Sequence, residues 1–101
     1  MSAPAYQFTA SAEADVDAIL AYTLETWGDA QAEAYVGGLF DLLGRLSARP
    51  ESGRLRQELP GSLRSFPYRE HIVFYTVFRD AILVIRVLHA RQNTLPAFFD
   101  T

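Results

Sequence analysis

The chain has 101 residues, half of them hydrophobic, which is the size of one small domain. It contains no cysteine, so disulfide bonds and thiolate metal ligands are excluded, and its formal net charge is −3. No apolar run approaches the roughly 20 residues of a membrane-spanning helix, and the first residues lack the basic and then apolar order of a secretory signal. We therefore expect a single cytoplasmic domain over residues 1–101.

The charges divide unevenly between the two halves of the chain. Residues 1–44 contain seven acidic residues and no basic residue, whereas residues 45–101 contain nine arginines and five acidic residues. The halves therefore carry −7 and +4, which sum to the net −3. Because a broad nucleic-acid surface needs many uncompensated cations, this balance favours protein partners and argues against sequence-specific contact with DNA or RNA.

Two helices are expected in the acidic half. Ser11 is a suitable N-cap for the first helix, which should end at Gly28. Asp29 can cap a second helix directly afterwards. Pro50 disfavours helical geometry in the residue before it, so the second helix should end near Arg49. The short junction predicts a helical hairpin.

Apolar residues recur at spacings of three and four along both expected helices. The two stripes are Ala12, Val16, Ile19, Leu20, Thr23 and Trp27, and then Ala32, Tyr35, Val36, Leu39, Leu43 and Leu46. Phe40 and Leu42 widen the second stripe beyond what one facing layer needs, so either core packing or a groove for a partner helix explains it. The candidates for such a groove are Tyr22, Trp27, Phe40 and Leu42. Trp27 itself should lie mostly in the core, because a tryptophan at a helix junction commonly locks two elements together.

In the basic half the pattern changes from helical to extended. We expect a strand bent at Pro67, and then strands over residues 71–78 and 81–88 joined by the tight turn Arg79–Asp80. With a short strand at residues 6–8, the element order is β-α-α-β-β-β. The sequence therefore predicts an α+β fold, a helical hairpin packed on a mostly antiparallel four-stranded sheet.

The tight turn fixes a register for the last two strands. The expected pairs are Phe78 with Ala81, Tyr75 with Val84, Val73 with Arg86, and His71 with Leu88. One face then collects apolar residues and should be covered by the helices: Ile72, Phe74, Thr76, Phe78, Leu83, Ile85 and Val87. The other face, with His71, Tyr75 and Arg86 among valines, is expected to be open.

The end of the last strand raises the question of function. Arg86 stands where an apolar residue would be less costly, and His89 and Arg91 follow it closely. Arg86 can face a target or pair with an acidic residue, for which the candidates are Glu58, Glu70 and Asp100. His89 fits a structural histidine bonded to the backbone or a catalytic base. Arg91 lies beyond the strand and is the better candidate for contact with a partner.

No metal or cofactor site is expected. The two histidines lie 18 residues apart, and neither has a second histidine or a carboxylate at helical spacing. There is no glycine-rich phosphate loop and no serine in a nucleophile elbow.

The last residues, LPAFFDT, place Phe98 and Phe99 beside a proline. Two adjacent exposed phenylalanines would promote association. We therefore expect this tail to fold onto the body of the domain.

Three separated segments resemble the ParE toxin family of the RelE/ParE superfamily. They are WGDAQAEAYVGGLFDLLGRLSARPESGR, GSLRSFPYREHIVFY and ILVIRVLHARQN, and the resemblance extends from Tyr6 to Asn93. It implies the toxin of a type II toxin-antitoxin pair, held inactive in a hetero-oligomer by a ParD-like antitoxin, with DNA gyrase as the target. It also implies action by binding rather than catalysis. The residues expected to contact the target are Arg86, His89, Arg91, Tyr75 and Arg64.

The superfamily has a second branch, the RelE-like endoribonucleases that cut messenger RNA on the ribosome. These enzymes resemble one another in using lysines, arginines and often a tyrosine for attack by a 2′-hydroxyl. Proton transfer needs a base with an accessible lone pair, but this chain has no lysine and arginine stays charged. Only His71, His89 or a tyrosine could move protons, which disfavours nuclease activity without removing it. A relic that binds its antitoxin and harms nothing is the third alternative.

Overall fold

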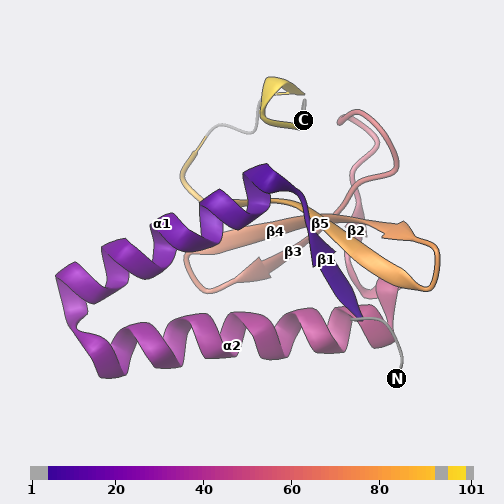
Figure 1. Cartoon of the computed structure of the whole chain (residues 1–101). Coiled ribbons are helices and arrows are strands. Elements are labelled where there is room, and N and C mark those ends of the chain that lie inside the picture. Colours follow the sequence, from indigo (N-terminus) through magenta and orange to yellow (C-terminus); the bar gives the residue numbers. More distant parts are fainter. Residues whose placement is uncertain (1–4, 93–95, 100–101) are drawn as a thin grey trace.

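The computed structural model describes residues 5–92 and 96–99, in which two long helices pack on one sheet (Figure 1). The strands are β1 (Tyr6–Phe8), β2 (Arg54–Leu55), β3 (Arg64–Tyr68), β4 (His71–Phe78) and β5 (Ala81–His89). The helices are α1 (Ala10–Trp27) and α2 (Asp29–Ala48), with short 3-10 helices η1 (Pro50–Ser52) and η2 (Pro96–Phe99). The expected α+β fold with a helical hairpin is confirmed, and the short strand β2 is an addition to the four strands expected.

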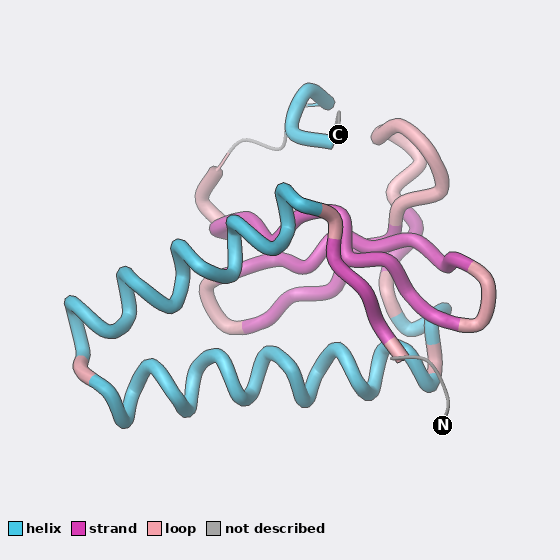
Figure 2. The backbone as a smooth tube through the Cα atoms, in the orientation of Figure 1, coloured by secondary structure: helices cyan, strands magenta, loops and turns pink. Residues whose placement is uncertain are grey.

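The sheet has the strand order β1-β5-β4-β3-β2. β1 pairs with β5 in parallel, and the other three pairs are antiparallel, so the sheet is mostly antiparallel as expected. Figure 2 shows α1 leading away from β1 to the helix junction, and α2 returning from that junction beneath the sheet. Within residues 5–92 and 96–99, no helix combines the length and hydrophobicity that crossing a membrane requires.

The ends of the two helices differ in part from the expectation. The side chain of Thr9, rather than Ser11, caps α1 by accepting a hydrogen bond from the amide of Ala12 at 3.0 Å. Gly28 ends α1 with φ of +90°, a backbone conformation that favours glycine. Because Gly28 is also the N-cap of α2, Asp29 is already the first helical residue and provides no side-chain cap.

The helices cover the face of the sheet that was expected to be open. The main core joins α1 and α2 to strand residues Val73, Tyr75, Ile82, Val84 and Val87. Tyr75 is fully buried there. Its hydroxyl donates to the carbonyl of Pro50 at 2.5 Å and accepts from the amide of Gly53 at 2.9 Å, so burial leaves no unpaired polar group. A tyrosine whose hydroxyl has backbone partners behaves as a core residue, so its polarity was a misleading guide to the exposed face.

The opposite face is also covered, so the expectation of an open sheet surface is wrong. A second core cluster consists of Leu59, Leu63, Phe74, Leu88 and Phe99, with Ile72, Ile85 and Phe98 packed against it. η2 and the loop before β3 lie across the sheet from α2 (Figure 1). The rings of Phe74 and Phe99 are 5.0 Å apart, edge to face. The predicted docking of the two tail phenylalanines is therefore confirmed, while Asp100 lies outside the described residues.

A β-bulge changes the register between β4 and β5. Near the turn the pairs are those expected, with Tyr75 opposite Val84, but the register shifts between Phe74 and Tyr75. Beyond the shift Phe74 pairs with Arg86 and His71 pairs with His89, instead of Val73 with Arg86 and His71 with Leu88. The extra residue also explains why Val84 and Val87 both face the helices although three positions separate them.

The edge of β5 beyond β1 is held by side chains of α1 and its cap. Thr9 donates to the carbonyl of Ile85 at 2.9 Å, and the carboxylate of Asp15 accepts from the amide of Val87 at 2.9 Å. Asp15 also binds Arg86 through two bonds, to Nε at 2.7 Å and to Nη2 at 2.8 Å. Arg86 Nη1 donates to the carbonyl of Phe98 at 2.9 Å. These contacts tie α1, β5 and η2 together at one point.

We predict that Asp15→Asn destabilises the fold by about 2 kcal/mol, since it breaks a charge-assisted pair whose side chains are only 21% and 15% exposed. The free energy of unfolding in urea measures the effect. Asp17→Asn, at an exposed position of the same helix, is the matched control and should change stability by less than about 0.5 kcal/mol. Equal stability of the two variants would contradict the anchoring role.

Candidate functional site

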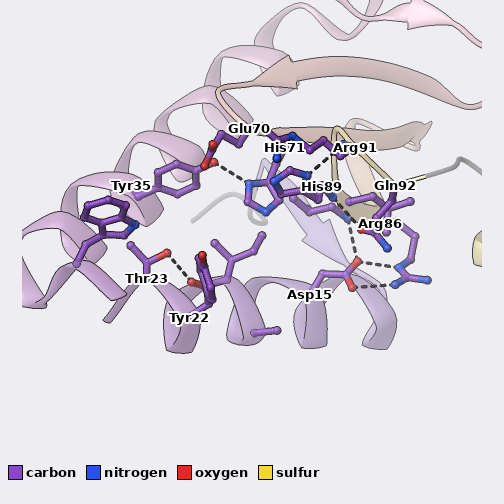
Figure 3. A pocket seen from close by; sticks show the side chains of 15 residues that line it. Asp15, Tyr22, Thr23, Tyr35, Glu70, His71, Arg86, His89, Arg91 and Gln92 are labelled. Carbon is purple, nitrogen blue, oxygen red and sulfur yellow. Dashed lines mark hydrogen bonds and ion pairs between the residues drawn. The ribbon is translucent and has the colours of Figure 1, made fainter. Parts of the chain in front are cut away.

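A pocket of about 470 Å³, called the histidine pocket below because His71 and His89 line it, opens between α1, the first half of α2, the start of β4 and the end of β5. This volume is in the range of small-ligand sites. Its polar lining includes Tyr35, Glu70, His71, His89, Arg91 and Gln92. In Figure 3 these side chains gather on the sheet side of the pocket, and Asp15 and Arg86 lie at the α1 side. The pocket therefore contains the cluster that the last strand suggested.

The bulge places the two histidines directly opposite each other on β4 and β5. His71 and His89 are directly paired, and their rings lie 5.3 Å apart at 73°. The Tyr35 hydroxyl, from α2, lies 2.7 Å from Nδ1 of His71. Nδ1 of His89 accepts from the amide of Arg91 at 3.1 Å, and the amide of His89 donates to Gln92 at 2.9 Å. The two histidines are 18 positions apart, and no sequence pattern indicated that they pair.

The hydrogen bonds and burial define the charge state of the cluster. Since Nδ1 of His89 accepts a hydrogen bond, the neutral form of this ring carries its proton on Nε2. Burial, and then the neighbouring His89, lower the pKa of His71. Burial raises the pKa of Tyr35, so its hydroxyl keeps its proton and can donate to a neutral His71. The cluster thus offers uncharged groups able to give or accept protons, beside the cation of Arg91.

Arg86 has a different role from Arg91. Its partner is Asp15 rather than Glu58 or Glu70, and the hydrogen bonds that Arg86 donates to the Asp15 carboxylate raise the pKa of Arg86. Arg86 is therefore neutralised within the protein and its charge is unavailable to a target. Arg91 is exposed, and no ion pair to it is found among residues 5–92 and 96–99.

The five residues expected to contact a target divide into two groups. Arg86, His89 and Arg91 all line the pocket. Tyr75 is buried in the main core, and Arg64 donates to the carbonyl of Gly53 at 2.8 Å, away from the pocket. The structure therefore joins three of the expected residues and places Tyr75 where no partner can reach it.

Sequence reasoning missed Asp15 and did not connect Tyr35 with His71. A signal for Asp15 was present, because it lies three positions after Ala12 and four before Ile19, inside the apolar stripe of α1. A carboxylate on a buried helix face needs a partner, and Arg86 stood in the last strand where an apolar residue would be less costly. No comparable signal pointed to the pairing of the histidines, since it depends on the bulge.

A second depression, the hairpin groove, lies on the helical hairpin itself. This groove of about 500 Å³ is lined by Leu20, Leu24, Asp29, Ala32, Glu33, Val36, Gly37 and Phe40. Leu24 and Phe40 are 40% and 37% exposed. Its apolar floor and acidic rim suit a basic amphipathic helix.

The four residues proposed for a partner groove are not together. Phe40 lines the hairpin groove, whereas Tyr22 and Trp27 line the histidine pocket. Leu42 is buried in the main core and offers no surface. Trp27 is 65% exposed, so the expectation that it lies mostly in the core is wrong. The chain turns between the helices at Gly28, and the Trp27 side chain lines the pocket.

Metal binding has no support in the described part of the chain. Across residues 5–92 and 96–99, no three histidine or acidic side chains are grouped so that they could hold a metal ion.

We predict that stability falls as the pH drops below about 6.5, the ordinary histidine value from which the pKa of His71 is lowered. Below that value the unfolded chain takes up a proton at His71 that the folded chain resists, so the stability is lost towards acidic pH. Urea unfolding between pH 5 and 8 of the parent and of His71→Gln measures the effect, and the variant should have the weaker pH dependence. Identical slopes would contradict the assignment to His71.

Comparison with known proteins places this chain in a family. Residues 6–94 match the family described as ParE toxin of type II toxin-antitoxin system, parDE. The chain is 34% identical over 97 residues to "Toxin ParE" of Escherichia coli, covering 95% of this chain and 94% of that protein. It is 33% identical over 89 residues to "Toxin ParE1" of Mycobacterium tuberculosis, covering 87% and 91%.

The fold is shared with a solved structure titled "Chromosomal ParDE TA system from P. aeruginosa". The TM-score is 0.71 at 23% identity, and the match covers 84% of this chain and 94% of that one. The order of elements, the sequence match over nearly all of the described residues and the named relatives agree. This chain belongs to the ParE toxin family of type II toxin-antitoxin systems.

Proposed function

We propose that this ParE-family toxin is neutralised by a ParD-type antitoxin and inhibits DNA gyrase by binding it directly in the cytoplasm. The observation that carries the proposal is a pair of separate surfaces. One is a groove on the helical hairpin with an apolar floor and two acidic residues, and the other is a pocket between the helices and the strands with an exposed arginine. Two such surfaces suit a protein that acts through contacts with other macromolecules.

The hairpin groove supports the antitoxin part of the proposal. Leu20, Leu24 and Phe40 supply an apolar floor, and Phe40 is held in place by ring contacts to Tyr6 at 6.4 Å and Phe8 at 6.2 Å. An amphipathic helix can insert apolar anchors between such side chains.

Charge specifies the partner further. Asp29 and Glu33 line the groove, and residues 1–44 carry −7 in total. Basic residues on the partner helix would meet this field, which speeds association and selects the correct partner. The antitoxin segment is therefore expected to combine apolar anchors with lysine or arginine.

The pocket supports action by contact at the target. Arg91 is exposed beside His89, whereas the charge of Arg86 is satisfied by Asp15. A contact with gyrase would thus depend on Arg91 and the surrounding aromatic side chains rather than on Arg86.

We predict that Leu24→Asp weakens antitoxin binding by at least about tenfold, because it places a carboxylate on the apolar floor of an acidic groove. Co-purification and isothermal titration calorimetry with the antitoxin measure the loss. Leu55→Asp is the matched control, since Leu55 is 43% exposed on β2 and is absent from the groove. Full co-elution of the Leu24 variant would place the antitoxin elsewhere.

We predict that the purified chain, added to gyrase, DNA and ATP, inhibits supercoiling or traps cleaved DNA, and that added antitoxin prevents this. Arg91→Gln should weaken the inhibition by about tenfold, whereas Arg79→Gln, in the exposed turn between β4 and β5, should not. Supercoiling that is unchanged by excess folded protein would contradict the gyrase proposal.

A second candidate function, RNA cleavage, is favoured by one observation, the direct pairing of His71 with His89 beside Tyr35. Two imidazoles and a phenol could supply the base and the acid that a 2′-hydroxyl attack requires. Incubation with translating ribosomes tests it: cleavage that disappears in His71→Gln and His89→Gln would support a nuclease. Intact messenger RNA together with gyrase inhibition would exclude it.

A further inference from the structure

The histidine pocket is one part of a longer trough. A second hollow of about 320 Å³ adjoins it and shares the lining residues Thr23, Trp27, Tyr35 and Glu70. The trough therefore runs from the strand ends of β4 and β5 to the junction of α1 and α2. It is large enough for an elongated small ligand with chemically different ends.

The α1 side of the trough carries two large aromatic side chains that the core does not use. Tyr22 is 66% exposed and Trp27 is 65% exposed. Exposed aromatic residues beside a pocket provide flat surfaces on which a planar ring can stack, and stacking tolerates any nucleobase because each has a π face. These two residues distinguish the trough from a simple ion site.

The strand side of the trough offers donors for an anion. Arg91 is exposed, and the neutral tautomer of His89 presents Nε2–H, since its Nδ1 is occupied by the amide of Arg91. His71 likewise uses Nδ1 for Tyr35. The described contacts of residues 5–92 and 96–99 thus engage one nitrogen of each ring and leave the other to a ligand.

Among the residues that line the trough, cationic side chains outnumber acidic ones. Three arginines line it (Arg69, Arg86 and Arg91) against two acidic residues (Asp15 and Glu70). Since Arg86 and Asp15 neutralise each other, Arg69 and Arg91 outweigh Glu70 by one charge. This excess of one positive charge, from residues of the half that carries +4, is a local preference for an anion beside the acidic helices.

We propose that the trough binds one nucleotide, with its base stacked on Trp27 and Tyr22 and its phosphate held by Arg91 and His89. The aromatic side chains decide against a plain carboxylate or inorganic anion, which would use the cations alone. One nucleotide, free or at the end of a nucleic-acid strand, does not require the broad basic surface that this chain lacks. The inference rests on the pocket geometry and is independent of gyrase, of the antitoxin and of RNA cleavage.

Titration of the full chain with adenosine monophosphate, adenosine and inorganic phosphate tests the proposal, followed by NMR of the histidine rings and by calorimetry. Adenosine monophosphate should shift the His71 and His89 resonances and bind at least about tenfold more tightly than either fragment. Arg91→Gln should weaken this binding by a similar factor. Trp27→Ala should weaken binding of the nucleotide but not of phosphate, and Arg79→Gln is the unchanged control.

Two further arms identify the source of the nucleotide. A 5′-phosphorylated oligonucleotide that binds more tightly than the monophosphate would assign the site to a strand end, and the reverse order would assign it to a free nucleotide. Absence of histidine shifts at millimolar nucleotide in the folded chain would overturn the proposal. So would equal binding by Arg91→Gln, or displacement of the nucleotide by an acidic peptide that binds more tightly.

Discussion

The attachment of α1 to the outer edge of β5 is the interaction on which the rest of the structure depends. β1 pairs with only three residues of β5, and beyond them the backbone of β5 needs other partners. Thr9 and Asp15 provide them, at Ile85 and Val87. The helix is therefore a cover for the strand edge as well as a layer over the sheet. Because α1 is tied at its N-terminal half, its C-terminal half extends past the strands and forms one wall of the pocket.

The β-bulge determines which residues of β4 and β5 face α1 across the pocket. With a regular register His71 would lie opposite Leu88, and the histidines would be offset along their strands. The extra residue in β5 pairs His71 with His89 and leaves Arg86 on the face of Phe74, within reach of Asp15 and of the carbonyl of Phe98. One inserted residue thus produces both the structural arginine and the histidine pair, which is typical of bulges beside functional sites.

The sequence predicted the elements better than their faces. Periodicity and the signals at Gly28 and Pro50 placed both helices, because these features act locally. The faces of β4 and β5 were reversed because both are apolar and each is covered, so alternation carried no information about which one meets the helices. The pairing of Tyr35 with His71 depends on tertiary contacts and on a bulge, and no local pattern encodes either. Family resemblance supplied the identity that spacing alone did not.

Arg86 and Arg91 show how stability and the proposed recognition can depend on different residues. Arg86 interacts with Asp15 at a partly buried site, where an unpaired charge would be costly, so evolution of a binding surface at that position would weaken the fold. Arg91, just beyond the strand, carries no such constraint. The hairpin groove, lined by apolar residues and by Asp29 and Glu33, adds a surface of different character. A partner selected by apolar anchors and basic charge at the groove therefore need not compete chemically for the ligand that Arg91, His89 and Trp27 would select.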